Sequence, residues 1–198
     1  MAVYTYVDDA ALATFLQRYD LGNILSFAGI AEGVENSNYL LRTDKNNYIL
    51  TLYEKRVEPT DLPFFLTLME TLAKSGINCP LPVSALDGSV LQELEGRPCA
   101  IFSFLDGTWS RFPNKEKCAE LGATMASMHH GAASMERHRP NALGPLSWQP
   151  LFASVKAQAD ELGGGMASKI EERLDQIIAD WPVGLPEGII HADLFPNN

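Results

Sequence analysis

The sequence predicts an α+β fold of two lobes: an N-terminal lobe with a five-stranded antiparallel sheet and a helix, then a hinge and a truncated helical lobe. Three observations predict it. Short apolar runs alternate with turn residues between positions 25 and 104, as in antiparallel strands. A helical pattern that begins near residue 60 interrupts them. From residue 114 onward, apolar residues recur at helical spacing.

The first elements are a helix and a meander of three strands. Asp8 or Asp9 can cap the helix, and Gly22 is expected to end it. Apolar runs broken by turn residues then predict the three strands, at residues 25–31, 38–43 and 48–53.

The second helix follows the third strand. Pro63 lies in its first turn, and Gly76 is its expected end. Further extended segments are expected at residues 83–86, 89–94 and 98–104. Residues 1–104 are therefore interpreted as one lobe, in which the helix is inserted into the sheet after the third strand.

The rest of the chain is expected to be a linker and a helical lobe. Residues 105–113 form the hinge, and residues 114–198 form the partial helical lobe. One helix carries Leu121, Met125 and Met128, and two more are expected at residues 148–162 and 166–180. A ligand is expected between the two lobes, because domain junctions are common ligand sites.

Composition excludes some classes of binding partner and indicates the cellular compartment. The net charge of −10 argues against nucleic acid or an anionic membrane, because both favour a basic surface. The N-terminus lacks a signal-peptide pattern, and no apolar run is long enough to span a membrane. Three cysteines without a C-x-x-C pair favour neither disulfides nor zinc. We therefore expect a cytoplasmic protein.

The last eight residues carry the clearest chemical pattern, H-x-D-x-x-x-x-N. Phosphoryl transfer needs a base for the acceptor hydroxyl and a ligand for the metal that holds the nucleotide phosphates. Asp193 is placed for the first role and Asn198 for the second, while His191 braces the loop. Residues 188–190 are interpreted as a buried strand before the loop. The alternative is an ordinary polar turn after a strand.

Several sequence blocks, together with the order of the lobes, resemble one family of kinases. They are residues 29–39, 48–56, 61–65, 139–145 and the terminal motif. Within the first two blocks, residues 35–39 (Glu-Asn-Ser-Asn-Tyr) and 50–56 (Leu-Thr-Leu-Tyr-Glu-Lys-Arg) point to the subfamily. The chain resembles the aminoglycoside phosphotransferase-like kinases, a small-molecule branch of the protein-kinase-like fold, and within them the bacterial homoserine kinases.

The resemblance implies ATP and Mg²⁺ as cofactors and L-homoserine as the phosphate acceptor, in a step toward threonine. The chain is interpreted as the front part of a longer kinase, with little transfer activity alone. Two alternatives remain open. One is another kinase of this superfamily, acting on choline, an aminoglycoside or a sugar, and the other is a pseudokinase or scaffold that binds nucleotide without transferring phosphate.

The resemblance also implies the nucleotide-binding residues. Gly29 and Gly33 would form a loop over the phosphates, although an ordinary hairpin turn also explains them. The other candidates are Asn36, Ser37, Asn38, Lys55, Glu70 and the linker residues Phe104 and Leu105, whose backbone would bind adenine. Glu70 is equally well explained as a solvated helix glutamate.

One position departs from the family pattern. Thr51 stands where such kinases usually carry a third-strand Lys or Arg. Lys55, Arg56 or Arg42 could supply the charge instead.

Overall fold

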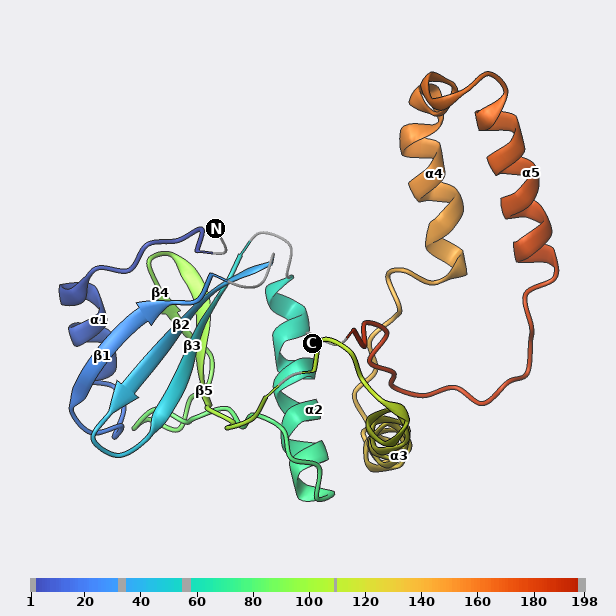
Figure 1. The fold of residues 1–198 in the computed structure, drawn as a ribbon. Helices are drawn as coiled ribbons and strands as arrows, with labels where there is room; N and C mark the ends of the chain where they lie inside the picture. Colours follow the sequence, from blue (N-terminus) through green and yellow to red (C-terminus); the bar gives the residue numbers. More distant parts are fainter. Residues whose placement is uncertain (1–2, 32–34, 55–57, 109, 196–198) are drawn as a thin grey trace. The chain divides into compact units, whose positions relative to one another are not determined.

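The computed structural model describes residues 3–31, 35–54, 58–108 and 110–195. Two units result from the pattern of contacts: His138–Glu187 is one, and the described residues on either side of it form the other. The α+β class and the five-stranded antiparallel sheet are confirmed (Figure 1).

The sheet has the strand order β1-β2-β3-β5-β4, with every neighbouring pair antiparallel. Its strands are β1 Ile24–Gly29, β2 Asn36–Thr43, β3 Asn47–Tyr53, β4 Gln92–Leu94 and β5 Arg97–Ser103. The predicted meander is therefore β1 to β3, and β5 adds to its open side. Thr51 lies in the middle of β3, opposite Asn38 of β2 and Ala100 of β5.

The expected strand at residues 83–86 is wrong, and the strand expected at 89–94 is reduced to β4. Val83 donates one backbone hydrogen bond to Ile101, but Ala85 bonds Ser89 across a turn and Leu86 bonds Arg18. Gly88 has a φ of +85°, which suits it to that turn. The segment is therefore joined to β5 at Val83, and from Ala85 onward it is held by a tight turn and by the backbone of Arg18.

Helix α1 spans Asp9–Leu16, and the predicted cap is confirmed because the Asp8 carboxylate accepts a hydrogen bond of 2.7 Å from the Ala11 amide. The expected end at Gly22 is wrong. The helix ends at Leu16, and the next residues bond back to Phe15 and Leu16 in a turn.

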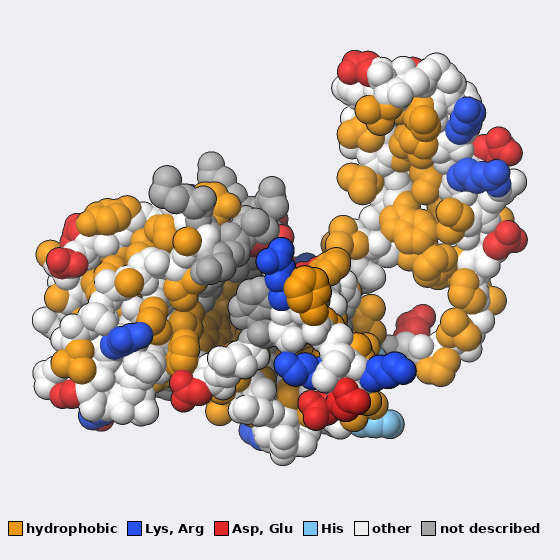
Figure 2. All heavy atoms as spheres, in the orientation of Figure 1, with side chains coloured by type: hydrophobic (Ala, Val, Ile, Leu, Met, Phe, Trp, Pro, Cys, Tyr) orange, Lys and Arg blue, Asp and Glu red, His pale blue; other side chains and the backbone are white. Residues whose placement is uncertain are grey.

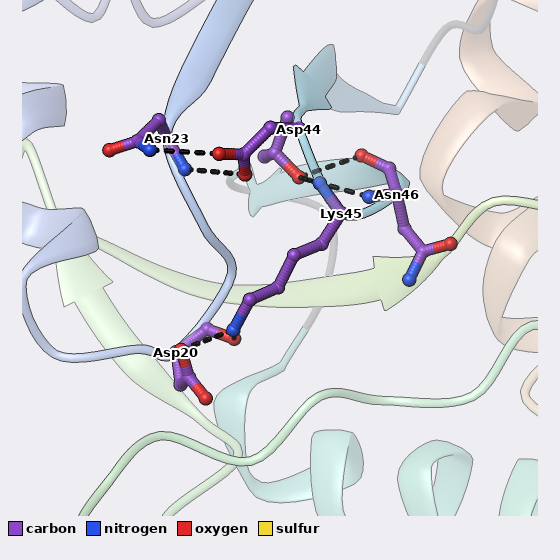
Figure 3. A network of polar contacts seen from close by, with 6 residues as sticks. Asp20, Asn23, Asp44, Lys45 and Asn46 are labelled. Carbon is purple, nitrogen blue, oxygen red and sulfur yellow. Dashed lines mark hydrogen bonds and ion pairs between the residues drawn. The ribbon is translucent and has the colours of Figure 1, made fainter.

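Gly22 instead lies beside the β2–β3 turn, directly before Asn23, which Figure 3 shows facing Asp44 of that turn. Asp44 in that turn accepts hydrogen bonds of 2.8 Å from both the backbone and the side-chain amide of Asn23. A Cβ atom on Gly22 would lie 2.1 Å from Asp44 Oδ1. The glycine thus permits a close approach between two chain segments.

The main core lies on one face of the sheet, between β2, β3, β5 and the N-terminal segment with α1. Alternate side chains of β2 point into it, so Ser37, Tyr39 and Leu41 are buried. The other members include Val7, Leu12, Phe15, Leu50, Leu52, Cys99 and Ile101. Asn38, Thr51 and Ala100 consequently lie on the opposite face.

Helix α2 (Leu62–Lys74) follows a short 3₁₀ turn, η1 (Pro59–Asp61), and ends just before Gly76, as predicted. Helix α3 (Lys115–Ala132) begins at Asn114, whose side chain accepts from the Lys117 amide at 2.9 Å. The two helices are in contact. A Cβ atom on Gly131 would lie 2.9 Å from the Cβ of Ser75, so a small residue is needed at this crossing.

The second unit is a helical hairpin. It comprises α4 (Pro145–Ala159), the 3₁₀ turn η2 (Asp160–Leu162) and α5 (Met166–Ala179), which confirms the two predicted helices. Lys156 pairs with Glu171 at 2.5 Å, and the rings of Trp148 and Trp181 meet edge to face. Figure 2 shows hydrophobic side chains gathered along this pair of helices.

Residues 188–190 do not form the expected buried strand. They are irregular, and 59% of the Ile190 surface is exposed. Among the described residues, no helix is both long and apolar enough to cross a membrane.

Candidate active site

The segment that carries the terminal motif is a tight, exposed loop. The Asp193 amide donates to His191 Nδ1 at 3.3 Å, and the Phe195 amide donates to the Asp193 carbonyl at 3.1 Å. Both His191 and Asp193 are exposed. The contact lets His191 hold the backbone of the predicted catalytic residue, as expected of a brace. The catalytic roles of the two residues stay predictions.

Ala192 lies between them in a left-handed conformation, with a φ of +65°. Such a conformation costs a residue other than glycine about 1–2 kcal/mol. Strained backbone of this kind concentrates at functional sites, where the surrounding structure holds it. The strained residue therefore lies between two of the three residues that the motif selects, His191 and Asp193.

Four predicted positions lie outside the described residues. They are Gly33 of the glycine loop, Lys55 and Arg56 after β3, and the expected metal ligand Asn198. Asn198 and the Asp193 carboxylate offer the oxygen donors that Mg²⁺ prefers, so the residue types fit the ion. Among the described residues, no group of three or more His, Cys, Asp or Glu side chains is placed to hold a metal.

Gly29 ends β1 and pairs with Tyr39 of β2. A Cβ atom on Gly29 would lie 2.8 Å from Cγ2 of Val3, so the glycine makes room for the N-terminal segment. This packing role needs no ligand. A contact between Gly29 and the nucleotide phosphates stays a prediction.

Strand alternation separates Ser37 from its two asparagine neighbours. The buried Ser37 hydroxyl accepts from the amides of Tyr4 and Thr5, at 2.8 and 3.0 Å, and donates to Glu54 Oε1 at 2.7 Å. Its hydrogen-bonding capacity is thus filled on the core face. The Ser37 hydroxyl therefore has no free capacity for a nucleotide, whereas a contact through the Ser37 backbone stays a prediction, as do the contacts of Asn36 and Asn38.

Asn38 meets Thr51 on the other face of the sheet. The Thr51 hydroxyl donates to Asn38 Oδ1 at 2.8 Å. At the start of β2, two positions before Asn38, Asn36 Oδ1 accepts from the Glu54 amide at 3.4 Å. Tyr53 lies opposite Asn36 on β3, and burial raises the pKa of Tyr53 to about 12. These groups are uncharged at neutral pH, so the middle of this face offers neutral hydrogen-bonding groups.

Of the three cations that could replace the third-strand charge, only Arg42 is described. It is exposed, at the end of β2 next to the β2–β3 turn, opposite Asn47. It lies four positions after Asn38 on β2, which corresponds to about 13 Å along a strand. Arg42 therefore does not supply a charge at the middle of β3.

Glu70 and the linker residues are placed as follows. Glu70 is half-buried in α2 and forms no ion pair with any described residue. Phe104 and Leu105 directly follow β5 and are partly exposed. The Phe104 amide donates to the Asn47 carbonyl at 3.3 Å, which leaves the Phe104 carbonyl and the Leu105 backbone for an adenine ring.

Glu54 was not selected from the sequence. Its carboxylate also accepts from the Thr5 hydroxyl at 2.7 Å and lies 3.2 Å from Arg97 Nε, with only 10% of its side chain exposed. Its partners come from the N-terminal segment, β2 and β5. A charged residue at a strand end is ordinarily solvated, so no sequence signal distinguishes it.

Comparison with known proteins identifies the family to which the chain belongs. The family model described as "Phosphotransferase enzyme family" matches residues 26–198. Two similar curated proteins are homoserine kinases, from Paramagnetospirillum magneticum (54% identical) and Chelativorans sp. strain BNC1 (50%), in both cases over the whole of this chain. The chain spans about 61–62% of the length of these relatives.

Solved structures show the same fold at low sequence identity. Spectinomycin phosphotransferase APH(9)-Ia, in complex with ADP and spectinomycin, has a TM-score of 0.72 at 15% identity, and the match covers 98% of this chain and 65% of that one. The GDP and kanamycin complex of APH(2″)-IIIa has a TM-score of 0.69 at 15% identity, covering 96% and 66%. The protein-kinase-like architecture is thereby confirmed.

Proposed function

This chain belongs to the phosphotransferase enzyme family, and on that premise we propose that the protein transfers the γ-phosphate of ATP to the hydroxyl of L-homoserine. The observation that carries the proposal is the identity of 50–54% to homoserine kinases over all 198 residues. The product is O-phospho-L-homoserine, and the activity belongs to threonine biosynthesis. The three free cysteines fit a reducing cytoplasm.

The terminal loop supplies the catalytic group of the proposal. Asp193 orients the homoserine hydroxyl and accepts its proton as that oxygen attacks the γ-phosphorus and the bond to ADP breaks. His191 holds the Asp193 backbone in place. Mg²⁺, for which Asn198 is the proposed ligand, neutralises phosphate charge when bound.

The nucleotide site of the proposal lies on the sheet face opposite the core. The core face is filled by residues of α1 and the N-terminal segment, which leaves the face that carries Asn38 and Thr51. Gly29, Gly33, Asn36, Lys55 and Glu70 are proposed to contribute there, and the backbone of residues 104–105 is proposed to bind adenine. We propose residues 1–104 as the nucleotide lobe, 105–113 as the hinge and 114–198 as the helical part.

Replacing Asp193 in the full-length protein tests the proposal. Asp193→Asn should lower kcat for homoserine by about 10²–10⁴-fold, because it removes the proton acceptor, while ATP affinity is retained. Asp180→Asn, at the end of α5, is a control with the same change of side chain. Near-normal turnover in Asp193→Asn contradicts the assigned role. A panel with choline, an aminoglycoside and sugars tests the acceptor, and a preference for any of these overturns homoserine.

A second candidate, a protein that binds nucleotide without transferring phosphate, is favoured by the neutral Thr51 at the middle of β3. Calorimetry with ATP·Mg²⁺ followed by a transfer assay separates the two functions. Binding without transfer in the full-length protein supports the second candidate. For the 198-residue chain alone we propose little transfer, and measurable homoserine phosphorylation by it contradicts this.

A further inference from the structure

The middle of the sheet face opposite the core carries an uncharged hydrogen-bonded pair. Asn38 of β2 and Thr51 of β3 face each other directly in the strand register, and their side chains are joined at 2.8 Å. Thr51 is buried, and its neighbour on β5 is the small, fully buried Ala100. The pair is therefore fixed by three adjacent strands.

The hydrogen bond sets the direction of the Asn38 amide. The Thr51 hydroxyl donates, so the oxygen of the Asn38 side chain is the group that turns toward β3. The amide nitrogen, with two N–H donors, is left for another partner. Among the described residues it donates to none. Two donors are thus held at the centre of this face.

No cation of the sheet lies near these donors. The five strands contain two cations, Arg42 and Arg97. Arg97 is on the core side, paired with Glu54, and Arg42 is about 13 Å from Asn38 along β2. Kinases of this general fold place a lysine on the third strand for the nucleotide phosphates, so the neutral pair occupies the place of a charge.

We propose that the Asn38 amide binds the polyphosphate of a nucleoside triphosphate, and that Thr51 is a positioning residue that aims this amide. The inference rests on the proposed function for the identity of the ligand. Amide donors bind phosphate without a full positive charge, so the contact depends less on ionic strength than a lysine contact does.

Asn38→Asp in the full-length protein tests the contact, because it places a negative charge against the phosphates at nearly unchanged size. The Kd for ATP should rise about tenfold or more, whereas the Kd for adenosine should stay within twofold. Asn47→Asp, on the same face at the other end of β3, is the matched control and should change neither value. An equal change for ATP and adenosine, or no change for ATP, overturns the proposal.

Thr51 variants test the positioning role. Thr51→Val removes the hydroxyl and should raise the ratio of the two Kd values, ATP over adenosine, about threefold to tenfold, while Thr51→Ser should restore it. Thr43→Val is the control, since Thr43, at the end of β2, is likewise a buried threonine, and its hydroxyl donates to the Asn46 carbonyl in the β2–β3 turn. It should lower the Tm without changing the ratio. If Thr51→Val also lowers only the Tm, the positioning role is wrong.

The ratio of the Kd for ATP to the Kd for adenosine does not depend on which molecule accepts the phosphate. A protein that fails to phosphorylate homoserine yet shows the expected ATP-specific losses refutes the proposed function and keeps this inference. If the protein phosphorylates homoserine and its Asn38→Asp variant binds ATP with wild-type affinity, the proposed function is supported and this inference is refuted.

Discussion

The Ser37 hydroxyl donates a hydrogen bond of 2.7 Å to Glu54 Oε1 and so joins the beginning of β2 to the end of β3. The same hydroxyl accepts from the backbone amides of Tyr4 and Thr5. Glu54 in turn pairs with Arg97 at 3.2 Å. One buried serine thereby ties the N-terminal segment to the sheet.

Ser37→Ala should destabilise the fold. The change leaves two backbone amides without their partner in a largely buried place and removes one of the two hydroxyl donors to Glu54 Oε1, at a cost of about 1–3 kcal/mol. Urea unfolding of the full-length protein measures the loss. Ser26→Ala, at an exposed position of β1, should change stability by less than about 0.5 kcal/mol. Equal midpoints for the two variants contradict the role of the Ser37 hydroxyl.

Gly22→Ala should be more damaging than a typical substitution of a left-handed glycine. Gly22 has a φ of +84°, and its added methyl group would collide with Asp44 Oδ1. Gly96→Ala is the matched control, because Gly96 is also left-handed, with a φ of +68°, but an added Cβ atom there would meet open space. The control should lose about 1–2 kcal/mol and Gly22→Ala clearly more, as measured by denaturant unfolding. If the two losses are the same, the close approach of Asp44 is irrelevant to stability.

Asp44 should make stability depend on acid pH. The side-chain amide of Asn23, followed by its backbone amide, holds the pKa of the Asp44 carboxyl below its usual range. A lowered folded-state pKa stabilises the fold above the unfolded-state pKa of about 3.9, and this contribution is lost as the pH falls through the folded value.

Unfolding free energies measured between pH 2 and pH 6 check this expectation. Asn23→Ala removes the largest cause, so the acid-side loss of stability in this variant should be shallower than in the wild type. A curve parallel to that of the wild type is the result that counts against the assignment.

Ala192 should tolerate glycine and reject a β-branched residue. A φ of +65° is open to glycine but strained for valine, whose branched Cβ crowds the backbone. Ala192→Gly should keep turnover within about threefold, and Ala192→Val should lower it by tenfold or more because the strain displaces Asp193. Steady-state kinetics of the full-length protein give both values. If turnover is the same in the two variants, the left-handed backbone has no part in placing Asp193.

Local patterns in the sequence were sufficient for most elements. The turn at residues 44–47 and the apolar runs beside it predict β2 and β3, and Pro63 with Gly76 frames α2. The predicted elements are wrong where residues far away in the chain determine the local conformation. Leu86 bonds Arg18, 68 positions away in the chain, and no local pattern near residues 83–86 contains that information.

In the candidate site, too, some features follow from the local sequence and others depend on distant contacts. The spacing of His191 and Asp193 is visible in the sequence, and their contact follows from it because they are two residues apart. The different roles of Ser37 and Asn38 depend on which strand face is covered by α1, and Glu54 acquires its role from Thr5 and Arg97. Such roles are set by tertiary packing.

Recognition of the N-terminal segment through its backbone has an evolutionary consequence. Ser37 contacts amide groups that every residue except proline possesses, and the Tyr4 and Tyr6 side chains are 58% and 78% exposed. Substitutions at positions 4 and 6 should therefore accumulate among homologues, with proline absent at positions 4 and 5. Ser37 itself should vary little, so selection acts on the serine that holds the segment more than on the exposed side chains at positions 4 and 6.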